Sequence, residues 1–251
     1  MIVLKTATEI DILRANGAIL ASVLNRVCEE VSLGQNTGEL DRLAERLIRE
    51  SGSKPAFRGM YGFPATICTS INEEIVHGIP SLKRQLKKGD ILSIDVGLYR
   101  SGMYVDMATT VPVGEVDEKA AKLIQVTEEA LWRGIGMVNI RNRLADVSHA
   151  IGSCVEDAGL YVVREYSGHG IGRDLHEDPQ ILNYGESGQG PRLQIGMVLA
   201  LEPMAKTAPG TVEVLADGWT VVTDQGELAA HFEHTVALTK NGVEVLTRGG
   251  V

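Results

Sequence analysis

Residues 91–113 read ILSIDVGLYRSGMYVDMATTVPV, and this stretch predicts the centre of the fold. Apolar residues alternate with other residues on both sides of a short polar break, which is the pattern of two strands joined by a tight turn. A turn centred between Arg100 and Ser101 pairs residues whose numbers sum to 201, so that Asp95 stands directly opposite Asp106. The stretch therefore predicts a buried antiparallel hairpin that carries two facing carboxylates.

Two carboxylates in that position would be expensive to bury. Directly opposed side chains have Cβ atoms about 4.5–5.5 Å apart. Buried at that distance, the two groups repel each other, and each loses its hydration unless it finds a partner. They would then either share a proton or hold a cation. A different register, which leaves one aspartate in solvent, is the alternative.

Two further acids lie in apolar stretches near the C-terminus. Glu202 is the only charge in MVLALEPM (197–204), and Glu233 alternates with apolar residues in HFEHTVAL (231–238). None of the four predicted strands contains Lys or Arg in its core, so ordinary salt bridges do not explain the acids. Carboxylate oxygens suit hard and borderline divalent ions, and bridging carboxylates suit two ions about 3.5–4 Å apart. The four acids therefore predict a metal site.

The stretch SGHGIGRDLHEDP (167–179) supplies two histidines, His169 and His176. Three glycines within five positions make a helix improbable, so we expect a loop. One imidazole from this loop would complete the ligand set. A histidine satisfied by ordinary polar contacts is the competing interpretation.

The order of predicted elements repeats along the chain. A helix is expected over about 8–31, opened by a capping box of Thr8 and Asp11, and a second helix ends near Glu50. Loops and short strands over 53–80 precede the hairpin. The second half again predicts two helices, over about 117–133 and 144–158, before strands at 161–167, 197–204 and 231–239. The pattern favours a pseudo-two-fold α/β fold in one domain, residues 1–251, with strands central and helices outside.

Composition limits the remaining classes of function. The 251 residues carry a net charge of −9, which disfavours broad contact with nucleic acid, DNA included, or with anionic membranes. No stretch approaches the roughly 18 apolar residues of a membrane span. Only three cysteines occur, which suggests a reducing compartment, so a cytoplasmic location is expected. The motifs GxxxxGK[ST], HExxH and GxSxG are missing from the sequence.

Six blocks together resemble one known family. They are NEEIVHGIP (72–80), GDILSIDVG (89–97), MYVDMATT (103–110), SGHGIGRDLHEDP (167–179), LALEPM (199–204) and DGWTVVTDQGELAAHFEHT (217–235). In this order they are similar to the short bacterial, or type I, methionine aminopeptidases of peptidase family M24. The resemblance implies the pita-bread fold, which has a pseudo-two-fold central antiparallel sheet with helices outside. It also implies a metal-dependent hydrolase that removes N-terminal methionine when the next residue is small.

The resemblance also implies roles for individual residues. Asp95 and Glu233 match positions that chelate one ion, Asp106 and Glu233 match bridging positions, and His169 and Glu202 match ligands of the other ion. The two ions would be Co, Mn, Fe or Zn. His77 and His176 match histidines that contact substrate, and Glu202 matches a proton shuttle. An apolar pocket for the methionine side chain is implied at Phe57, Met60, Phe63, Cys68, Leu175 and Trp219.

Several alternatives stay open at this point. The pocket residues could be plain core aromatics and thioethers. His231, where the family commonly has Gln, could hydrogen-bond a metal ligand or be exposed and idle. The basic loop with Lys83, Arg84, Lys87 and Lys88 could contact the ribosome or be merely solvated. A monomer is expected. Competing functions are an Xaa-Pro exopeptidase of the same fold and a non-catalytic peptide-binding relative.

Overall fold

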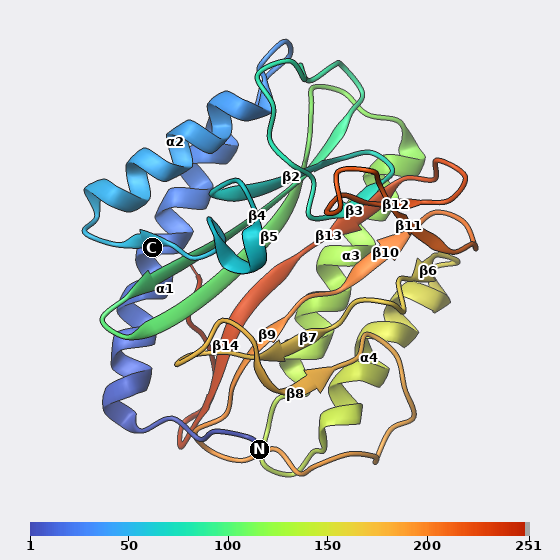
Figure 1. The fold of residues 1–251 in the computed structure, drawn as a ribbon. Helices are drawn as coiled ribbons and strands as arrows, with labels where there is room; N and C mark the ends of the chain where they lie inside the picture. The colour runs from blue at the N-terminus through green and yellow to red at the C-terminus, as the bar shows by residue number, and fades with distance from the viewer. Residues whose placement is uncertain (249–251) are drawn as a thin grey trace.

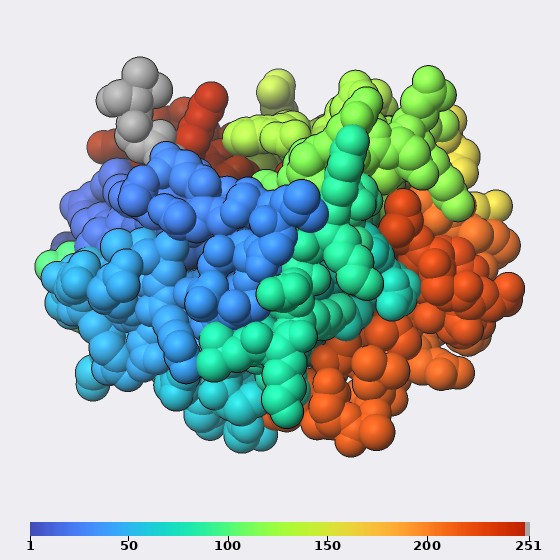
Figure 2. Space-filling model, turned by 90° about the horizontal axis from the view of Figure 1, so that it is seen from above, coloured from blue at the N-terminus to red at the C-terminus, as the bar shows by residue number. Residues whose placement is uncertain are grey.

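A computed structural model describes residues 1–248, so the predicted domain 1–251 extends three residues beyond the described part. The chain forms a mixed α/β structure with strands in the middle and helices outside, as the sequence predicts (Figure 1). Seen from above, a teal segment near residues 75–90 separates the blue N-terminal helices from orange residues near 210–225 (Figure 2). Among the described residues, no helix is long and apolar enough to cross a membrane.

The helices are α1 (Ala7–Glu29), α2 (Thr37–Glu50), α3 (Glu118–Gly136) and α4 (Leu144–Asp157), with a 3-10 turn at Met60–Gly62. The strands of the first half are β1 (Lys54–Pro55), β2 (Ile67–Ile71), β3 (Glu74–Val76), β4 (Ile91–Arg100) and β5 (Met103–Pro112). Those of the second half are β6 (Tyr161–Val162), β7 (Gly168–Gly170), β8 (Glu177–Ile181), β9 (Val198–Leu201), β10 (Met204–Lys206), β11 (Val212–Val214), β12 (Val221–Thr223), β13 (Ala229–His231), β14 (Glu233–Thr239) and β15 (Gly242–Val245).

The predicted hairpin exists, but its register differs from the expectation. Arg100 pairs with Met103, so the loop is Ser101-Gly102, and paired residue numbers sum to 203. Both loop residues have positive φ, 52° and 81°, as in the two-residue turns whose twist matches that of the strands. Asp106 therefore lies opposite Gly97, and Asp95 lies opposite Ala108. The two aspartates are diagonal neighbours on one face of the sheet, not a directly opposed pair.

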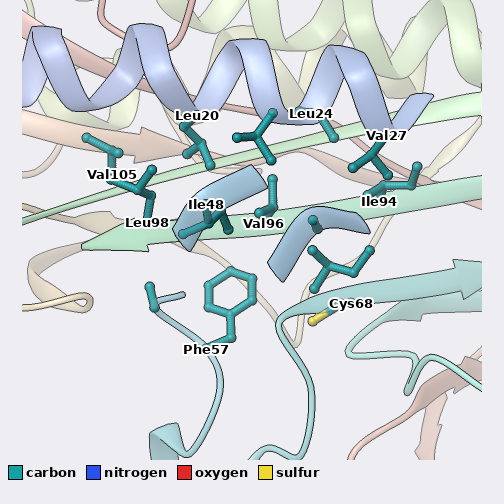
Figure 3. Close-up of a cluster of buried hydrophobic side chains, with 14 of the residues drawn as sticks. Leu20, Leu24, Val27, Ile48, Phe57, Cys68, Ile94, Val96, Leu98 and Val105 are labelled. Atoms are coloured by element: carbon teal, nitrogen blue, oxygen red, sulfur yellow. The ribbon is translucent and has the colours of Figure 1, made fainter. Parts of the chain in front are cut away.

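The other face of this hairpin forms a hydrophobic core. Because side chains alternate along a strand, Ile94, Val96 and Leu98 point away from Asp95. Figure 3 shows these residues facing Leu20, Leu24 and Val27 of α1. All of them are buried. The same alternation that builds this core turns the two aspartates toward the opposite side, where the sheet curls around a cavity.

The second half repeats this plan. Helix α3 contacts β9, β13 and β14, just as α1 contacts β4 and β5. Within the described residues the main sheet has nine strands, with the path β1-β4-β5-β14-β9-β7-β8 and with β15 and β2 beside it. Antiparallel pairing of β14 with β5 joins the two halves. The predicted succession of helix pair and strands in each half is confirmed.

Three local predictions are wrong. Helix α1 begins at Ala7 with a capping box of Thr6 and Glu9, because the Thr6 hydroxyl accepts from the Glu9 amide while the Glu9 carboxylate accepts from the Thr6 amide. Of the strand expected over 161–167, only β6 forms. Glu202 lies in the break between β9 and β10, next to Pro203, which has no amide hydrogen to continue the pairing.

Candidate active site

One cavity of about 150 Å³ gathers the predicted site residues. Its walls contain the four acids, three of the histidines and the six apolar pocket residues named from the sequence. They are Asp95, Asp106, Glu202, Glu233, His77, His169, His176, Phe57, Met60, Phe63, Cys68, Leu175 and Trp219. Tyr61 also lines the cavity and was missed by the sequence analysis.

The acids arrive from both halves of the sheet. Asp95 lies on β4 and Asp106 on β5, while Glu233 begins β14 opposite Ala108 and Glu202 follows β9. Potential ligand atoms of Asp106, His169 and Glu233 all lie within 4.8 Å of one another. Because no Lys or Arg lines this cavity, the acids have no cationic side chain among the lining residues to neutralise them.

The electrostatics of the acids favour a bound cation. Burial raises the pKa of Asp95 to about 7. Burial and then the charges of Glu233 and Asp95 raise the pKa of Asp106 well above its ordinary value. The pKa values of Glu202 and Glu233 are raised in the same way, first by burial and then by neighbouring carboxylates. Positive charge at this position would relieve the repulsion and restore the ionised forms.

Unpaired oxygens support the same conclusion. The Oδ1 atom of Asp95 and the Oε1 atom of Glu233 are buried without a hydrogen-bond partner. Buried polar atoms are almost always paired, so such exceptions need an explanation. Together with the imidazole of His169, the oxygen-rich donor set fits divalent cations such as Mn, Fe, Co and Zn. The residues present therefore fit the metal centre that the sequence predicts.

His169 is oriented as a ligand would be. Its Nδ1 donates to the carbonyl oxygen of Gly170 at 2.8 Å, which fixes the tautomer because a carbonyl can only accept. The lone pair on Nε2 then faces the acids, with Glu202 Oε1 3.5 Å away. Burial, followed by the proximity of His176, lowers the pKa of His169 to about 4. A neutral imidazole with a free nitrogen is the form that binds metal.

His231 lies behind Glu202 and does not line the cavity. Its Nε2 is 3.7 Å from Glu202 Oε2, and both of its ring nitrogens are buried without a hydrogen-bond partner. Burial lowers the pKa of His231 to about 3, so the ring is neutral at pH 7. This position is compatible with support of Glu202 and incompatible with the exposed, idle alternative, because the residue is only 2% exposed.

The other two histidines flank the cavity. His77 follows β3 with a φ of 60°, a left-handed conformation that costs a non-glycine residue free energy. Its ring meets Trp219 edge to face at 6.3 Å. His176 immediately precedes β8 and is exposed, and Tyr61 lies nearly parallel to it with ring centroids 6.4 Å apart. Tyr61 also has positive φ, and no feature of the sequence predicts this conformation.

The apolar wall is built closely. Phe63 and Trp219 pack edge to face at 5.1 Å. Phe57 lies over Gly97, where an added Cβ would approach its ring to 2.6 Å. Gly97 thus leaves space for Phe57 directly beside the strand that carries Asp95. Phe57, Phe63, Cys68 and Leu175 are buried, while Met60 and Trp219 keep part of their surface open.

Comparison with known proteins identifies the relatives of this architecture. A family model described as metallopeptidase family M24 matches residues 11–240. The chain is 49% identical over 247 residues to a methionine aminopeptidase of Clostridium perfringens, covering 98% of this chain and 99% of that protein. It is also 49% identical over 248 residues to methionine aminopeptidase 1 of Bacillus subtilis, covering 99% and 100% of the two chains.

Solved structures agree. The crystal structure of a methionine aminopeptidase from Thermotoga maritima superposes with a TM-score of 0.97 at 45% identity, covering 99% of this chain and 100% of that chain. A prolidase from Pyrococcus horikoshii has a TM-score of 0.78 at 23% identity, with 98% of this chain but only 64% of that chain covered. The latter likeness concerns the fold alone.

Proposed function

This chain belongs to metallopeptidase family M24, and from that membership we propose that it removes the N-terminal methionine from proteins and peptides whose second residue is small. It has the pita-bread fold of its relatives, and it is a metal-dependent hydrolase. The observation that carries the proposal is the meeting of four unneutralised acids, two buried and two half-buried, and one neutral histidine in a cavity with an apolar wall. The relatives named methionine aminopeptidase support the choice of substrate.

The metal centre is assigned to five residues: Asp95, Asp106, His169, Glu202 and Glu233. The unpaired oxygens of Asp95 and Glu233 and the free Nε2 of His169 support this assignment. Divalent ions held there would acidify water to a nucleophile near neutral pH and would attract the free α-amine of a substrate. Binding of the α-amine would explain why only the first residue of a chain is released.

The remaining polar residues perform the proton and hydrogen-bond steps. His176, at the mouth, donates to the oxygen of the scissile carbonyl as negative charge develops, a type of stabilisation worth about 3–4 kcal/mol. His77 holds the amide that follows the scissile bond. Glu202 accepts a proton from the attacking water and transfers it to the leaving amine.

The apolar wall receives the methionine side chain. Phe57, Met60, Phe63, Cys68, Leu175 and Trp219 form this pocket, next to the acids that would hold the α-amine. Methionine is flexible and makes favourable contacts between its sulfur and aromatic rings, which this wall provides.

One assay separates this proposal from its alternatives. Purified protein is given Met-Ala-Ser and Xaa-Pro peptides with Mn²⁺ or Co²⁺, and parallel samples contain EDTA. We expect cleavage of Met-Ala-Ser that EDTA abolishes. Cleavage of Xaa-Pro peptides but not of Met-Ala-Ser would contradict the proposal, and absence of any cleavage with metal demonstrably bound would favour a peptide-binding protein.

A ribosomal partner has weaker support. Of the four basic residues over 83–88, Arg84 pairs with Glu74 at 2.5 Å and Lys88 pairs with Glu115 at 3.2 Å. Two of the charges are therefore already paired within the chain, which favours the interpretation as a solvated loop. Co-sedimentation with ribosomes, compared with the Lys83→Ala/Lys87→Ala variant, tests the point. We propose a cytoplasmic, monomeric protein of one domain.

A further inference from the structure

The segment 171–176 joins β7 to β8 and carries two cavity residues, Leu175 and His176. Ile171 and Leu175 are buried in the core, but Arg173 and Asp174 between them are exposed, so packing of side chains does not hold the middle of the segment in place. The position of this middle part, next to the mouth of the cavity, therefore depends on its hydrogen bonds and ion pairs.

A buried ion pair provides that attachment. The Lys5 ammonium pairs with the carboxylate of Glu177, and the two side chains are only 1% and 5% exposed. The backbone amide of Lys5 is fixed separately, since it donates to the carbonyl of Gly196 at 2.7 Å. Burying two charges is costly, and replacing such a pair by apolar residues is often neutral or stabilising. A contribution to the free energy of unfolding therefore does not explain why this ion pair is present.

Glu177 closes the segment on itself. Its Oε1 accepts hydrogen bonds from the backbone amides of Arg173, at 2.7 Å, and Asp174, at 3.2 Å. The Lys5 ammonium binds the other oxygen, Oε2. One carboxylate thus ties the beginning of the segment to the residue directly after His176, and Lys5 sets the position of that carboxylate.

The fit around Lys5 is close. A Cβ added at Gly172 would lie 2.4 Å from Lys5 Cε, so the segment rests on the lysine side chain. A second ion pair runs in parallel, because Arg173 Nε donates to Glu9 Oε1 at 2.7 Å. The N-terminal residues before and within the first turn of α1 thereby hold the segment twice.

We propose that Lys5 is a positioning residue for His176: through Glu177 it holds the segment 171–177 so that the His176 imidazole lies where it meets the scissile carbonyl. The inference rests on the proposed function of the site, in which His176 donates to that carbonyl. Lys5 itself does not line the cavity.

The test is a double-mutant cycle between Lys5 and His176. We expect Lys5→Met to lower kcat for Met-Ala-Ser by about 10- to 100-fold, the cost of a displacement of about 1 Å at a reacting group. KM should change less than about two-fold, and metal stoichiometry should stay unchanged. In a His176→Ala background, Lys5→Met should lower kcat no further, because the residue through which it acts is gone. Equal losses in both backgrounds would overturn the proposal.

Two further variants complete the design. Glu177→Gln should reproduce the effect of Lys5→Met in both backgrounds. If Lys5→Met does not fold, Glu177→Gln replaces it in the cycle. Arg14→Met is the control, since it removes the ion pairs of Arg14 with Asp11 and Glu244, which do not involve the segment. It should leave kcat unchanged, and a loss equal to that of Lys5→Met would contradict the proposal.

Hydrogen exchange tests the attachment of the segment by Lys5 independently of the proposed peptidase activity. In Lys5→Met the amides of Arg173 and Asp174 should exchange faster than in wild type, whatever the substrate, and unchanged protection would refute the proposed attachment. Failure of the wild type to cleave Met-Ala-Ser would instead refute the proposed function. Cleavage by the wild type together with additive losses in the cycle would refute only the role of Lys5.

Discussion

His169 and His176 lie edge to face, with ring centroids 4.5 Å apart and planes inclined by 78°. The first belongs to β7 and the second immediately precedes β8, and these strands pair with an irregularity next to His169. That irregularity lets two imidazoles separated by seven positions meet at one cavity. Yet only His169 presents a fixed, unprotonated nitrogen to the acids, while His176 remains exposed at the mouth. The two rings thus occupy different positions relative to the acids, as the different roles proposed for them require.

Asp106→Asn should abolish most turnover and leave the fold intact. The amide keeps the size of the side chain but cannot bridge two cations, so we expect kcat/KM for Met-Ala-Ser to fall by at least about 100-fold. Thermal stability of the metal-free protein should not decrease, because one of several repelling buried carboxylates is removed. Steady-state kinetics, bound-metal analysis and circular dichroism provide the check. Unchanged rates would contradict the bridging role.

The contribution of Asp95 to the stability of the metal-free protein should fall as pH rises. Asp95 has a pKa of about 7 in the folded chain, against an ordinary value of 3.8, so between these two pH values the folded state keeps a proton that the unfolded state has lost. Stability decreases wherever the unfolded state binds fewer protons. Asp95→Asn lacks this titration.

The difference in free energy of unfolding, variant minus wild type, should therefore grow by a few kcal/mol from pH 4 to about 7 and then level off. Urea unfolding in EDTA at several pH values measures it. The buried histidines titrate in both proteins and cancel in the difference. A difference that stays constant over this range would show that Asp95 does not retain its proton.

His231→Leu should weaken metal binding without loss of stability. The change removes two buried nitrogens that lack hydrogen-bond partners, but it also removes the neighbour 3.7 Å from the Glu202 carboxylate. We expect affinity for Mn²⁺ to fall by about 10-fold, as is typical when support of a metal ligand is lost. Calorimetric titration measures this. His231→Gln, which retains a donor, should bind nearly as wild type, and equally tight binding by the leucine variant would make His231 irrelevant to the site.

Tyr61→Ala should change substrate binding and little else. The residue is 80% exposed and lies parallel to His176 at the mouth, so its loss should hardly affect thermal unfolding. We expect KM for Met-Ala-Ser to rise several-fold with kcat nearly constant, the signature of lost uniform binding. Tyr61→Phe is the matched control and should behave as wild type. A fall in kcat at constant KM would instead place the tyrosine in the chemical step.

The sequence predicts the broad plan well because that plan rests on hydrophobic periodicity. Paired helices, the long hairpin and the acids in apolar strands all follow from local patterns. Register does not, since it depends on whether the turn is centred before or after Ser101. The expected Asp95–Asp106 opposition fails for this reason, although both acids still share one face.

What local patterns could not supply lies in contacts between distant segments. Tyr61 lies at the mouth of the cavity because its backbone is left-handed, a conformation that the local residue types do not predict. Burial of Lys5 depends on its meeting Glu177, a residue 172 positions away. The cavity could be foreseen residue by residue mainly because six sequence blocks match a family, and the metal and substrate roles of its residues remain predictions.

The pairing of β5 with β14, which joins the two halves of the molecule, has a consequence for how the halves are held together. The pairing of β14 with β5 consists of two residue pairs, Glu233 with Ala108 and His234 with Met107, and carboxylates lie on both sides of it. The pairing of β12 with β3 is a second connection between the halves. Cations bound by carboxylates from both halves would cross-link the strands on the two sides of this short pairing. We therefore expect binding of Mn²⁺ to slow hydrogen exchange at the backbone amides of Asp106 and Thr235. We expect a chelator to weaken the contact between the halves before either half unfolds.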